Sequence, residues 1–371
     1  MKFLLPWVSA YLVSLSFEPY GIWILLIPAL WIMTRLLFVE EKKLLNRVIH
    51  FASFVYGINL FGFYWLAYTF HDFGHLPWVA AIPMSVTMLF LASLASALWA
   101  FIFFRYVYPL IERKTPGEWG LFLGIFVFYL AWEYFDYRFF GWSIVMGFGS
   151  NELLLASVGY LKTHGWRIYF FLFIALSFVF LIQAKKQGKF YWKTLLASLV
   201  FLLIPASLGA INRKNLKKFY ARSQPVLMLQ GNIGNFEKKI KELDAPPSFH
   251  NIVKQYRNLV EKAAIEIHAE SIQDPWVVWP ETALPILPIS DEGARQQVEH
   301  WVRLTKGSHI IGGYEENPES GNDFNVSMLF DDNGYVDRYR KNILIPFGEY
   351  FPGDFLYPDI YKKFPVLNHF S

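Results

Sequence analysis

Long apolar runs dominate the first 211 residues of the chain. An α-helix needs about 20 such residues to cross about 30 Å of hydrocarbon. Seven runs approach or exceed that length, and the first, fifth and sixth are short: Phe3–Phe17, Ile22–Phe38, Phe51–Phe70, Trp78–Phe104, Leu121–Trp132, Ile168–Ile182 and Thr194–Ile211. A single run of this kind is also typical of a buried helix in a soluble protein. Seven in succession predict an α-helical transmembrane bundle of about seven spans over residues 1–211.

After Ile211 the pattern changes to short apolar runs separated by turns and amphipathic stretches. A charged segment, Phe236–Asp244, precedes Ser248–Ala269, where apolar residues recur at helical spacing and predict a helix. Strands that alternate with helices indicate a layered α/β domain, here over residues 212–371. Five runs have the length and composition of its strands: Pro225–Gln230, Trp276–Trp279, His309–Gly313, Asn325–Phe330 and Val336–Arg340.

Composition agrees with two different solvents for the two parts of the chain. Hydrophobic residues make up 54% of the chain and charged residues only 17%, against about 25% charged residues in an ordinary soluble protein. The formal charge is a modest +4, and no Lys/Arg run alternates with aromatic residues as in a nucleic-acid groove. We therefore expect a membrane as partner and no nucleic acid.

Cysteine is absent from all 371 residues. Within them there is therefore no disulfide framework, no thiolate metal site and no thiol nucleophile. No His-Glu-His or carboxylate cluster has the spacing of a metal site either. Neither a metal nor a cofactor is expected.

Basic residues predict the orientation, because positively charged short loops stay cytoplasmic. With the N-terminus inside, the predicted inner segments hold Lys2, Lys42, Lys43, Arg47, Arg105, Arg113, Lys114, Lys185, Lys186, Lys189 and Lys193. The outer segments hold only Arg138, Lys162 and Arg167, although Arg213, Lys214, Lys217 and Lys218 just beyond the last span count against this orientation. The α/β domain is then expected outside. Ionisable residues at the outer ends, Glu133 among them, are either solvated ends or part of a cavity wall.

Glu281 is the first candidate for chemistry. It leaves the end of the apolar strand Trp276–Trp279 directly after Pro280, where we expect it to be poorly solvated. A partly desolvated glutamate is suited to general-base work near neutral pH. The alternative is an acidic residue at a helix start, which interacts with the helix dipole.

Lys341 and Glu349 form the second candidate. Lys341 ends the last predicted strand, and Glu349 follows a Phe-Gly turn eight residues later. A lysine ammonium near a carboxylate can stabilise an oxyanion in acyl transfer. The alternative for Lys341 is a solvated charge at a strand end.

Several further motifs stand out along the chain: Gln230-Gly231-Asn232-Ile233, Val278–Ala283, Lys341–Tyr350, Phe17–Gly21, Phe63-Tyr64-Trp65 and Phe140-Gly141-Trp142. Together they resemble the apolipoprotein N-acyltransferases, a membrane branch of the nitrilase (carbon-nitrogen hydrolase) superfamily. The likeness covers nearly the whole chain, and a Trp-Pro-Glu-Thr motif followed by a Pro-Phe-Gly-Glu-Tyr motif after a multi-span bundle is specific. The resemblance implies a nitrilase-like sandwich for residues 212–371, of which only the N-terminal part is present.

The resemblance also implies a Glu-Lys-Cys triad. Glu281 matches its general base, Lys341 its oxyanion-stabilising lysine, and Glu349 a second glutamate that supports the site. The cysteine of the family lies several tens of residues beyond the lysine, and this chain has none. We therefore expect a C-terminally truncated chain, inactive as it stands, with a naturally short, inactive homologue as the alternative.

The implied reaction is the last step of lipoprotein maturation in the bacterial inner (cytoplasmic) membrane. A phospholipid acyl donor would acylate the cysteine, and the N-terminal amine of a diacylglyceryl-cysteine lipoprotein would accept the acyl chain, with the α/β domain on the periplasmic side. Two rival hypotheses are a membrane-tethered nitrilase-type amidohydrolase and a lipoprotein-binding protein without a nucleophile. A transporter is the weakest, since no internal repeat or pair of broken helices occurs.

Overall fold

The computed structural model describes residues 2–72, 76–135, 142–187, 192–219, 224–233, 246–281, 283, 292–317, 323–345, 349–350 and 359. The charged segment Phe236–Asp244 lies outside these residues. The chain forms two compact units: the first consists of Met1–His71 and His75–Ala221, and the second of Arg222–Ser371 with Asp72–Gly74. The first is helical, and the second contains a five-stranded sheet.

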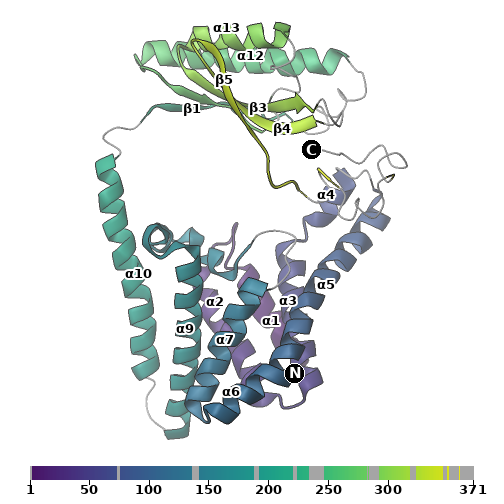
Figure 1. Ribbon diagram of the computed structural model, residues 1–371, viewed down its shortest axis with the longest axis vertical. Coiled ribbons are helices and arrows are strands. Elements are labelled where there is room, and N and C mark those ends of the chain that lie inside the picture. The colour runs from purple at the N-terminus through teal and green to yellow at the C-terminus, as the bar shows by residue number, and fades with distance from the viewer. Residues whose placement is uncertain are drawn as a thin grey trace. The chain divides into compact units, whose positions relative to one another are not determined.

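The first unit is a bundle of helices (Figure 1). Its helices are α1 (Leu5–Ser14), α2 (Leu26–Thr34), α3 (Leu44–Gly62), α4 (Leu66–Asp72), α5 (Trp78–Ile102), α6 (Tyr108–Lys114), α7 (Glu118–Phe135), α8 (Glu152–Ala156), α9 (Val158–Gln187) and α10 (Trp192–Phe219). Wide π-helical turns, Arg35–Glu40 and Phe103–Val107, extend α2 and join α5 to α6. Lys162, with φ 56° and ψ 171°, breaks α9 near its start.

Five helical stretches in the described part of the chain are long and apolar enough to cross a membrane: Trp23–Glu40, Leu44–Gly62, Trp78–Lys114, Val158–Lys186 and Leu196–Leu216. The prediction of an apolar helical bundle is therefore confirmed in outline. The two other predicted spans correspond to α1 and α7, which have 10 and 18 residues. Seven spans remain a prediction.

The predicted span Phe51–Phe70 was wrong in its bounds. The helix α3 begins at Leu44 and ends at Gly62, and Phe63 leaves helical geometry with φ −119° and ψ 25° before α4 begins at Leu66. Hydropathy alone does not register this break, because glycine weakens a helix without changing the apolar character of the run.

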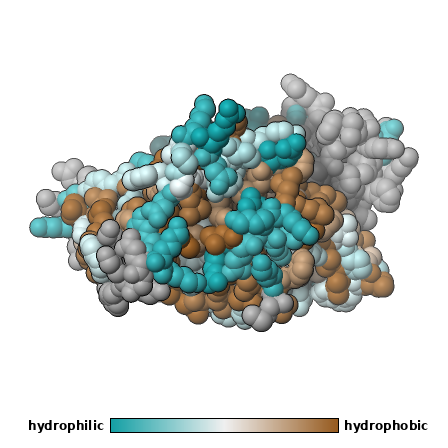
Figure 2. Space-filling view, turned by 90° about the horizontal axis from the view of Figure 1, so that it is seen from below, coloured by the Kyte–Doolittle hydropathy of each residue, from teal (hydrophilic) through white to brown (hydrophobic). Residues whose placement is uncertain are grey.

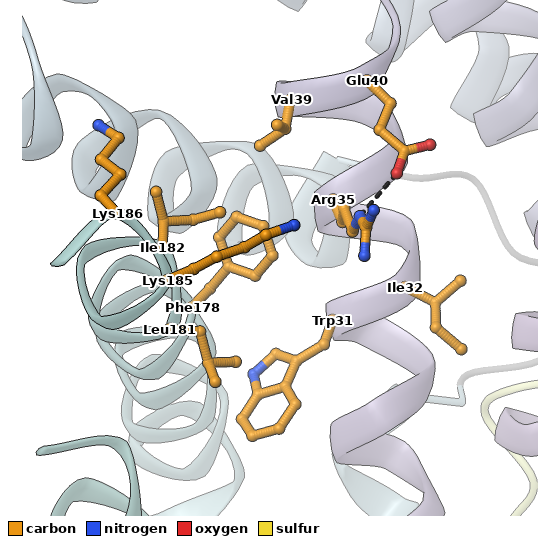
Figure 3. Close-up of a pocket in the computed structure, with 10 residues that line it drawn as sticks. All are labelled: Trp31, Ile32, Arg35, Val39, Glu40, Phe178, Leu181, Ile182, Lys185 and Lys186. Atoms are coloured by element: carbon orange, nitrogen blue, oxygen red, sulfur yellow. Dashed lines mark hydrogen bonds and ion pairs between the residues drawn. The ribbon is translucent and has the colours of Figure 1, made fainter. Parts of the chain in front are cut away.

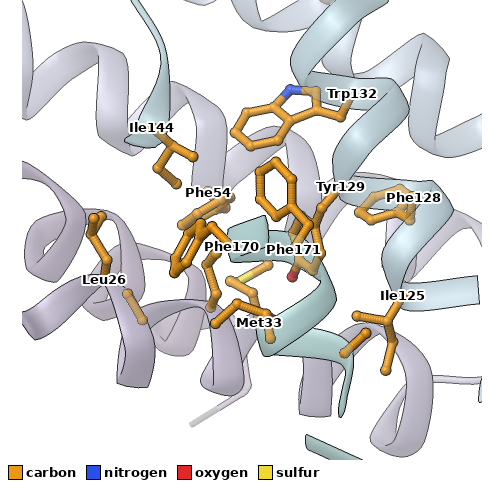
Figure 4. Packing of buried hydrophobic residues seen from close by; sticks show 14 of the residues in the cluster. Leu26, Met33, Phe54, Ile125, Phe128, Tyr129, Trp132, Ile144, Phe170 and Phe171 are labelled. Carbon is orange, nitrogen blue, oxygen red and sulfur yellow. The ribbon is translucent and has the colours of Figure 1, made fainter. Parts of the chain in front are cut away.

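Aromatic and aliphatic side chains fill the centre of the bundle (Figure 4). Phe54, Phe128, Trp132 and Phe171 are each fully buried there. Helices α1 and α3 approach closely at Gly57, where an added Cβ would lie 2.7 Å from the Cβ of Ala10. Small residues allow this kind of close contact between membrane helices.

The outer surface of the bundle differs from that of a soluble protein. Large apolar side chains are exposed on it, for example Leu91 at 55% and Leu203 at 61%. Hydrophilic residues instead gather in patches at the end of the bundle that carries α6, with hydrophobic residues between and around them (Figure 2). Apolar flanks and a polar end are typical of a membrane-spanning bundle.

The second unit contains β1 (Val226–Met228), α12 (Pro246–Ala269), β2 (Trp276–Val278), α13 (Glu292–Thr305), β3 (Ser308–Glu316), β4 (Asp323–Asp331) and β5 (Gly334–Arg340). The strands lie in the order β1-β2-β3-β4-β5. Strands β1, β2 and β3 are parallel, and β3, β4 and β5 are antiparallel. Each of the five predicted strands and the predicted helix is present, with ends that differ by a few residues.

Helices α12 and α13 lie on one face of this sheet (Figure 1). The sequence reasoning missed α13, although its buried positions Val298, Trp301, Val302 and Thr305 have helical spacing. Trp301 packs on Trp279, which follows β2, with ring centroids 5.2 Å apart. A mixed sheet covered by helices bears out the layered α/β prediction, while the nitrilase-like sandwich remains a prediction.

Candidate functional site

Polar side chains of the second unit gather where several strands of its sheet begin or end. The parallel strand β2 ends there and leads through Trp279 and Pro280 to Glu281. Because β4 runs antiparallel to β3, the first residues of β4, with Asn325, lie at the same end of the sheet. The last strand, β5, ends there as well, so that Lys341 follows directly and its N–H donates to the Asn325 carbonyl oxygen at 2.9 Å.

Lys341 holds the centre of the cluster. Its Nζ lies 3.0 Å from Glu281 Oε1 and 2.9 Å from Glu349 Oε1. The Lys341 side chain is only 25% exposed. The structure thus brings together the three residues that the sequence predicted for the site, and Lys341 is not the solvated strand-end charge of the alternative.

Asn325 completes the cluster, and the sequence reasoning missed it. Its Nδ2 donates to Glu281 Oε1 at 2.7 Å and to Glu349 Oε1 at 2.9 Å. Glu281 Oε1 and Glu349 Oε1 therefore each accept from the same two donors, the Asn325 amide and the Lys341 ammonium. The available signal was a polar residue that opens a predicted apolar strand, since asparagine is depleted in strands.

Glu349 is held by the backbone around it. The N–H of Ile345 donates to Glu349 Oε2 at 2.8 Å, and the N–H of Glu349 donates to the Ile345 carbonyl oxygen at 2.9 Å. The residue is 9% exposed. A buried carboxylate with this many donors is suited to orient Lys341 rather than to meet a substrate.

Glu281 differs from its prediction in one respect. It lies in a turn beyond β2, but its side chain is 62% exposed. The expectation that it is poorly solvated was therefore wrong, because Glu281 lies in a turn beyond the strand and not in the buried strand itself. What distinguishes Glu281 is its contact with Lys341 and Asn325, not desolvation.

The charge of Lys341 is secured by its neighbours. Burial by itself lowers the pKa of Lys341, but the hydrogen bonds to Glu349 and Glu281 and the charges of these carboxylates outweigh it, so that the pKa is raised. The side chain is accordingly an ammonium at neutral pH. A fixed cation of this kind can stabilise negative charge that develops on a nearby oxygen.

An adjacent ion pair fixes the end of β5. Arg340 donates from Nε and Nη2 to the two carboxylate oxygens of Glu315 on β3, each at 2.8 Å. Its guanidinium also lies 4.1 Å from the centroid of the Phe324 ring. Hydrogen bonding to Arg340 holds the pKa of Glu315 low despite its burial. A bidentate pair is geometrically restrictive, so it limits movement of the neighbouring Lys341.

The arrangement provides a carboxylate that can accept a proton and a cation that can stabilise an oxyanion. In the part of the chain that the structure describes, no group of three His, Asp or Glu side chains is placed to hold a metal ion. A proton acceptor beside a fixed cation is the pairing that acid–base chemistry on a carbonyl group uses.

Comparison with known proteins covers both units. The apolipoprotein N-acyltransferase N-terminal domain matches residues 9–153. An apolipoprotein N-acyltransferase of Bdellovibrio bacteriovorus is 25% identical over 98% of this chain, and one of Photobacterium profundum is 24% identical over 96% of it. One of Geobacter metallireducens is 25% identical over the full chain. The predicted resemblance is confirmed.

The chain spans about two thirds of the length of these relatives. The aligned part covers 66% of the Bdellovibrio protein, 65% of the Photobacterium protein and 68% of the Geobacter protein.

Proposed function

This chain is a relative of the apolipoprotein N-acyltransferases, and from that premise we propose that it forms the membrane bundle and part of the active site of such an enzyme. The proposed reaction transfers an acyl chain from a membrane phospholipid to the N-terminal amine of a diacylglyceryl-cysteine lipoprotein. The observation that carries the proposal is the position of Lys341 Nζ, 3.0 Å from Glu281 Oε1 and 2.9 Å from Glu349 Oε1. Asn325, which donates to both carboxylates, is the fourth residue of this cluster.

In the first half of the reaction, the Glu281 carboxylate accepts the proton of a cysteine thiol. The thiolate attacks the ester carbonyl carbon of the phospholipid, and a carbon–sulfur bond forms. Lys341 stabilises the oxyanion of the tetrahedral intermediate. The ester carbon–oxygen bond then breaks, and the proton from Glu281 passes to the leaving lysophospholipid oxygen.

In the second half, the lipoprotein amine attacks the thioester carbonyl carbon. Glu281 accepts the proton that the amine loses, and Lys341 again stabilises the oxyanion. A carbon–nitrogen bond forms, the carbon–sulfur bond breaks, and the thiolate regains a proton. The bundle would keep the acyl chains in hydrocarbon throughout both steps.

The proposal requires a thiol, and residues 1–371 contain no cysteine. We place the nucleophile in chain that continues beyond Ser371, several tens of residues after Lys341. Sequencing the source gene past the codon for Ser371 tests this directly. A stop codon at that point would contradict the enzyme and favour a binding protein without a nucleophile.

We further propose residues 1–211 as the membrane domain and residues 212–371 as part of a nitrilase-like domain. The distribution of the basic residues supports a position of that domain on the periplasmic side of the bacterial inner membrane. To examine this, a cysteine is introduced at exposed Ile265 in the protein from the complete gene. A membrane-impermeant thiol reagent reaches that cysteine only from its own side, and the unaltered protein gives the background labelling of any native thiol. Labelling only after the cells are opened would contradict the periplasmic placement.

The activity test uses the protein encoded by the complete gene, reconstituted with phospholipid and a diacylglyceryl lipopeptide. Glu281→Gln should lower the rate of N-acylation by about 10²–10⁴-fold, because the general base is lost. Lys341→Met should lower it by about 10²–10³-fold, because the oxyanion loses its cation. Mass spectrometry of the lipopeptide gives the rates.

Matched controls replace an exposed carboxylate and an exposed lysine on α12, Glu266→Gln and Lys262→Met. Both should keep full activity. Equal loss in the controls and the site variants would contradict the assigned roles. Release of free fatty acid without N-acyl lipopeptide would favour the amidohydrolase, and lipopeptide binding without either product would favour the binding protein.

A further inference from the structure

A groove opens between the end of α2 and the end of α9, within the bundle alone. Its volume is about 640 Å³, in the range of small-molecule sites. Trp31, Phe178, Leu181 and Ile182 form its apolar wall. The indole N–H of Trp31 donates to Ser177 Oγ at 3.0 Å, so the ring position is fixed.

Cations from two separate helices meet at the mouth of this groove. Arg35 comes from the turn that extends α2, and Lys185 and Lys186 come from the last turn of α9. Figure 3 shows the Lys185 side chain crossing the groove with its ammonium directed toward Arg35. The carboxylate that lines the groove is Glu40, which lies 2.6 Å from Arg35 Nε.

Local helix effects explain only part of this arrangement. Lysines in the last turn of a helix interact favourably with its dipole, which accounts for Lys185 and Lys186 separately. They do not account for three basic side chains from two helices lining one apolar groove, whose lining contains a single carboxylate. Glu40 pairs with Arg35, and Glu118 lies 3.9 Å from Lys186 Nζ. An anion between Lys185 and Arg35 would compensate the positive charge that remains.

We propose that this groove binds a phospholipid with an anionic headgroup. The phosphate lies between Arg35 and Lys185, and an acyl chain lies along Trp31, Leu181 and Ile182. Basic pockets between membrane helices bind anionic headgroups in this way. A free phosphate ion would leave the apolar wall uncovered, whereas a lipid occupies both parts of the groove.

The proposed lipid is distinct from the acyl donor of the reaction. The end of α9, whose residues line the groove, lies at the same end of the bundle as α6 (Figure 1), where the inner basic residues are predicted. It belongs to the first unit, whereas Glu281, Lys341 and Glu349 belong to the second. The inference therefore stands independently of the proposed acyl transfer.

The test uses the protein from the complete gene, solubilised in mild detergent, with dioleoyl phosphatidylglycerol as probe and native mass spectrometry as readout. The double variant Arg35→Gln with Lys185→Gln should weaken retention about 30-fold, at about 1 kcal/mol for each basic side chain. The matched control is Arg113→Gln with Lys114→Gln, two exposed cations on α6. It should bind as the unaltered protein does.

Each further outcome bears on the proposal. If the double variant does not fold, Lys185→Gln alone should still weaken retention about fivefold. Equal weakening in the α6 control, or equal retention of dioleoyl phosphatidylcholine, would overturn the inference, because the groove would then not recognise an anionic lipid. Displacement of the lipid by equimolar inorganic phosphate would show a phosphate site instead and would also overturn it.

Discussion

Apolar residues mean different things in the two units of this chain. In the bundle they lie on both sides of a helix: on α5, Leu89 is 4% exposed and Leu91 is 55% exposed. In the sheet unit, the apolar positions of α13 lie on its buried face. Hydrocarbon accepts apolar side chains as readily as a protein core does, and water does not. In the bundle, hydrophobicity therefore shows where a helix lies but not which of its faces is buried. In the sheet unit, it also shows the buried face.

Polar side chains give the complementary information. In the bundle, Glu133 is 5% exposed, and its Oε1 lies 3.5 Å from Arg167 Nε. It also accepts from the Ile144 N–H at 3.2 Å. Of the two interpretations of Glu133, a solvated end is therefore wrong. An ionisable group within the bundle turns inward to a partner, because hydrocarbon offers none.

Removing a core aromatic from the sheet unit should have the largest effect on this comparison. Trp301 is 1% exposed and packs on Trp279, so Trp301→Ala should lower the free energy of unfolding by about 3–5 kcal/mol. Hydrogen exchange of the peptides that cover 276–330 measures it. Trp119→Ala, at a bundle position 70% exposed, should leave that exchange unchanged. If exchange in Trp301→Ala were as slow as in the unaltered protein, that result would contradict the core role of Trp301.

A charge on an exposed apolar position should separate the two solvents. Leu91→Asp on α5 should cost about 2.5–3.5 kcal/mol, because the carboxylate would face hydrocarbon. Ile265→Asp on α12, at a position 68% exposed, should change stability by less than about 0.5 kcal/mol. A translocon insertion assay measures the first and urea unfolding the second. Equal tolerance at both positions would remove the evidence for lipid around α5.

The pH dependence of stability should come from the sheet unit. Trp279 Nε1 donates to His309 Nδ1 at 3.2 Å, and His309 Nε2 lies 2.8 Å from Thr305 Oγ1. Protonation of His309 would put an N–H on Nδ1, facing the indole N–H that now donates to it. Burial lowers the pKa of His309 to about 3. The unfolded imidazole titrates near 6.5, so below that pH the unfolded state binds more protons.

Stability is thus fully present above about pH 6.5 and is lost as the pH falls toward 3, by up to about 1.4 kcal/mol per pH unit. Urea unfolding between pH 6.5 and 5 measures the slope. In His309→Gln the slope should become much shallower. An unchanged slope in that variant would assign the pH dependence to another group.

The smallest expected effect concerns a hydrogen bond inside the bundle. Trp132 Nε1 donates to Ser96 Oγ at 3.0 Å, and Ser96→Ala should cost only about 0.6 kcal/mol, the usual size of such bonds between membrane helices. Thr305→Val should cost about 1–3 kcal/mol, because it removes a buried partner of His309. Denaturant titration compares them. A reversed order would show that the bundle depends more on its polar contacts than the sheet unit does.

Much of the sheet unit follows from local sequence. Short apolar or β-branched runs separated by turns predict β3, β4 and β5. The helix α13 was missed because polar residues outnumber the apolar ones that mark its buried face. The break after Gly62 escaped prediction because hydropathy does not respond to backbone geometry.

By itself, the sequence determined that one part of the chain is apolar enough for a membrane and the other is not, and its motifs marked Glu281, Lys341 and Glu349. Only the tertiary structure decided that Asn325 joins them, that Glu281 is exposed, and that Arg35 and Lys185 share one groove. Composition and periodicity are local properties of the chain. Whether residues 44 or 150 positions apart lie at one site depends on strand order and helix packing, which no local pattern contains.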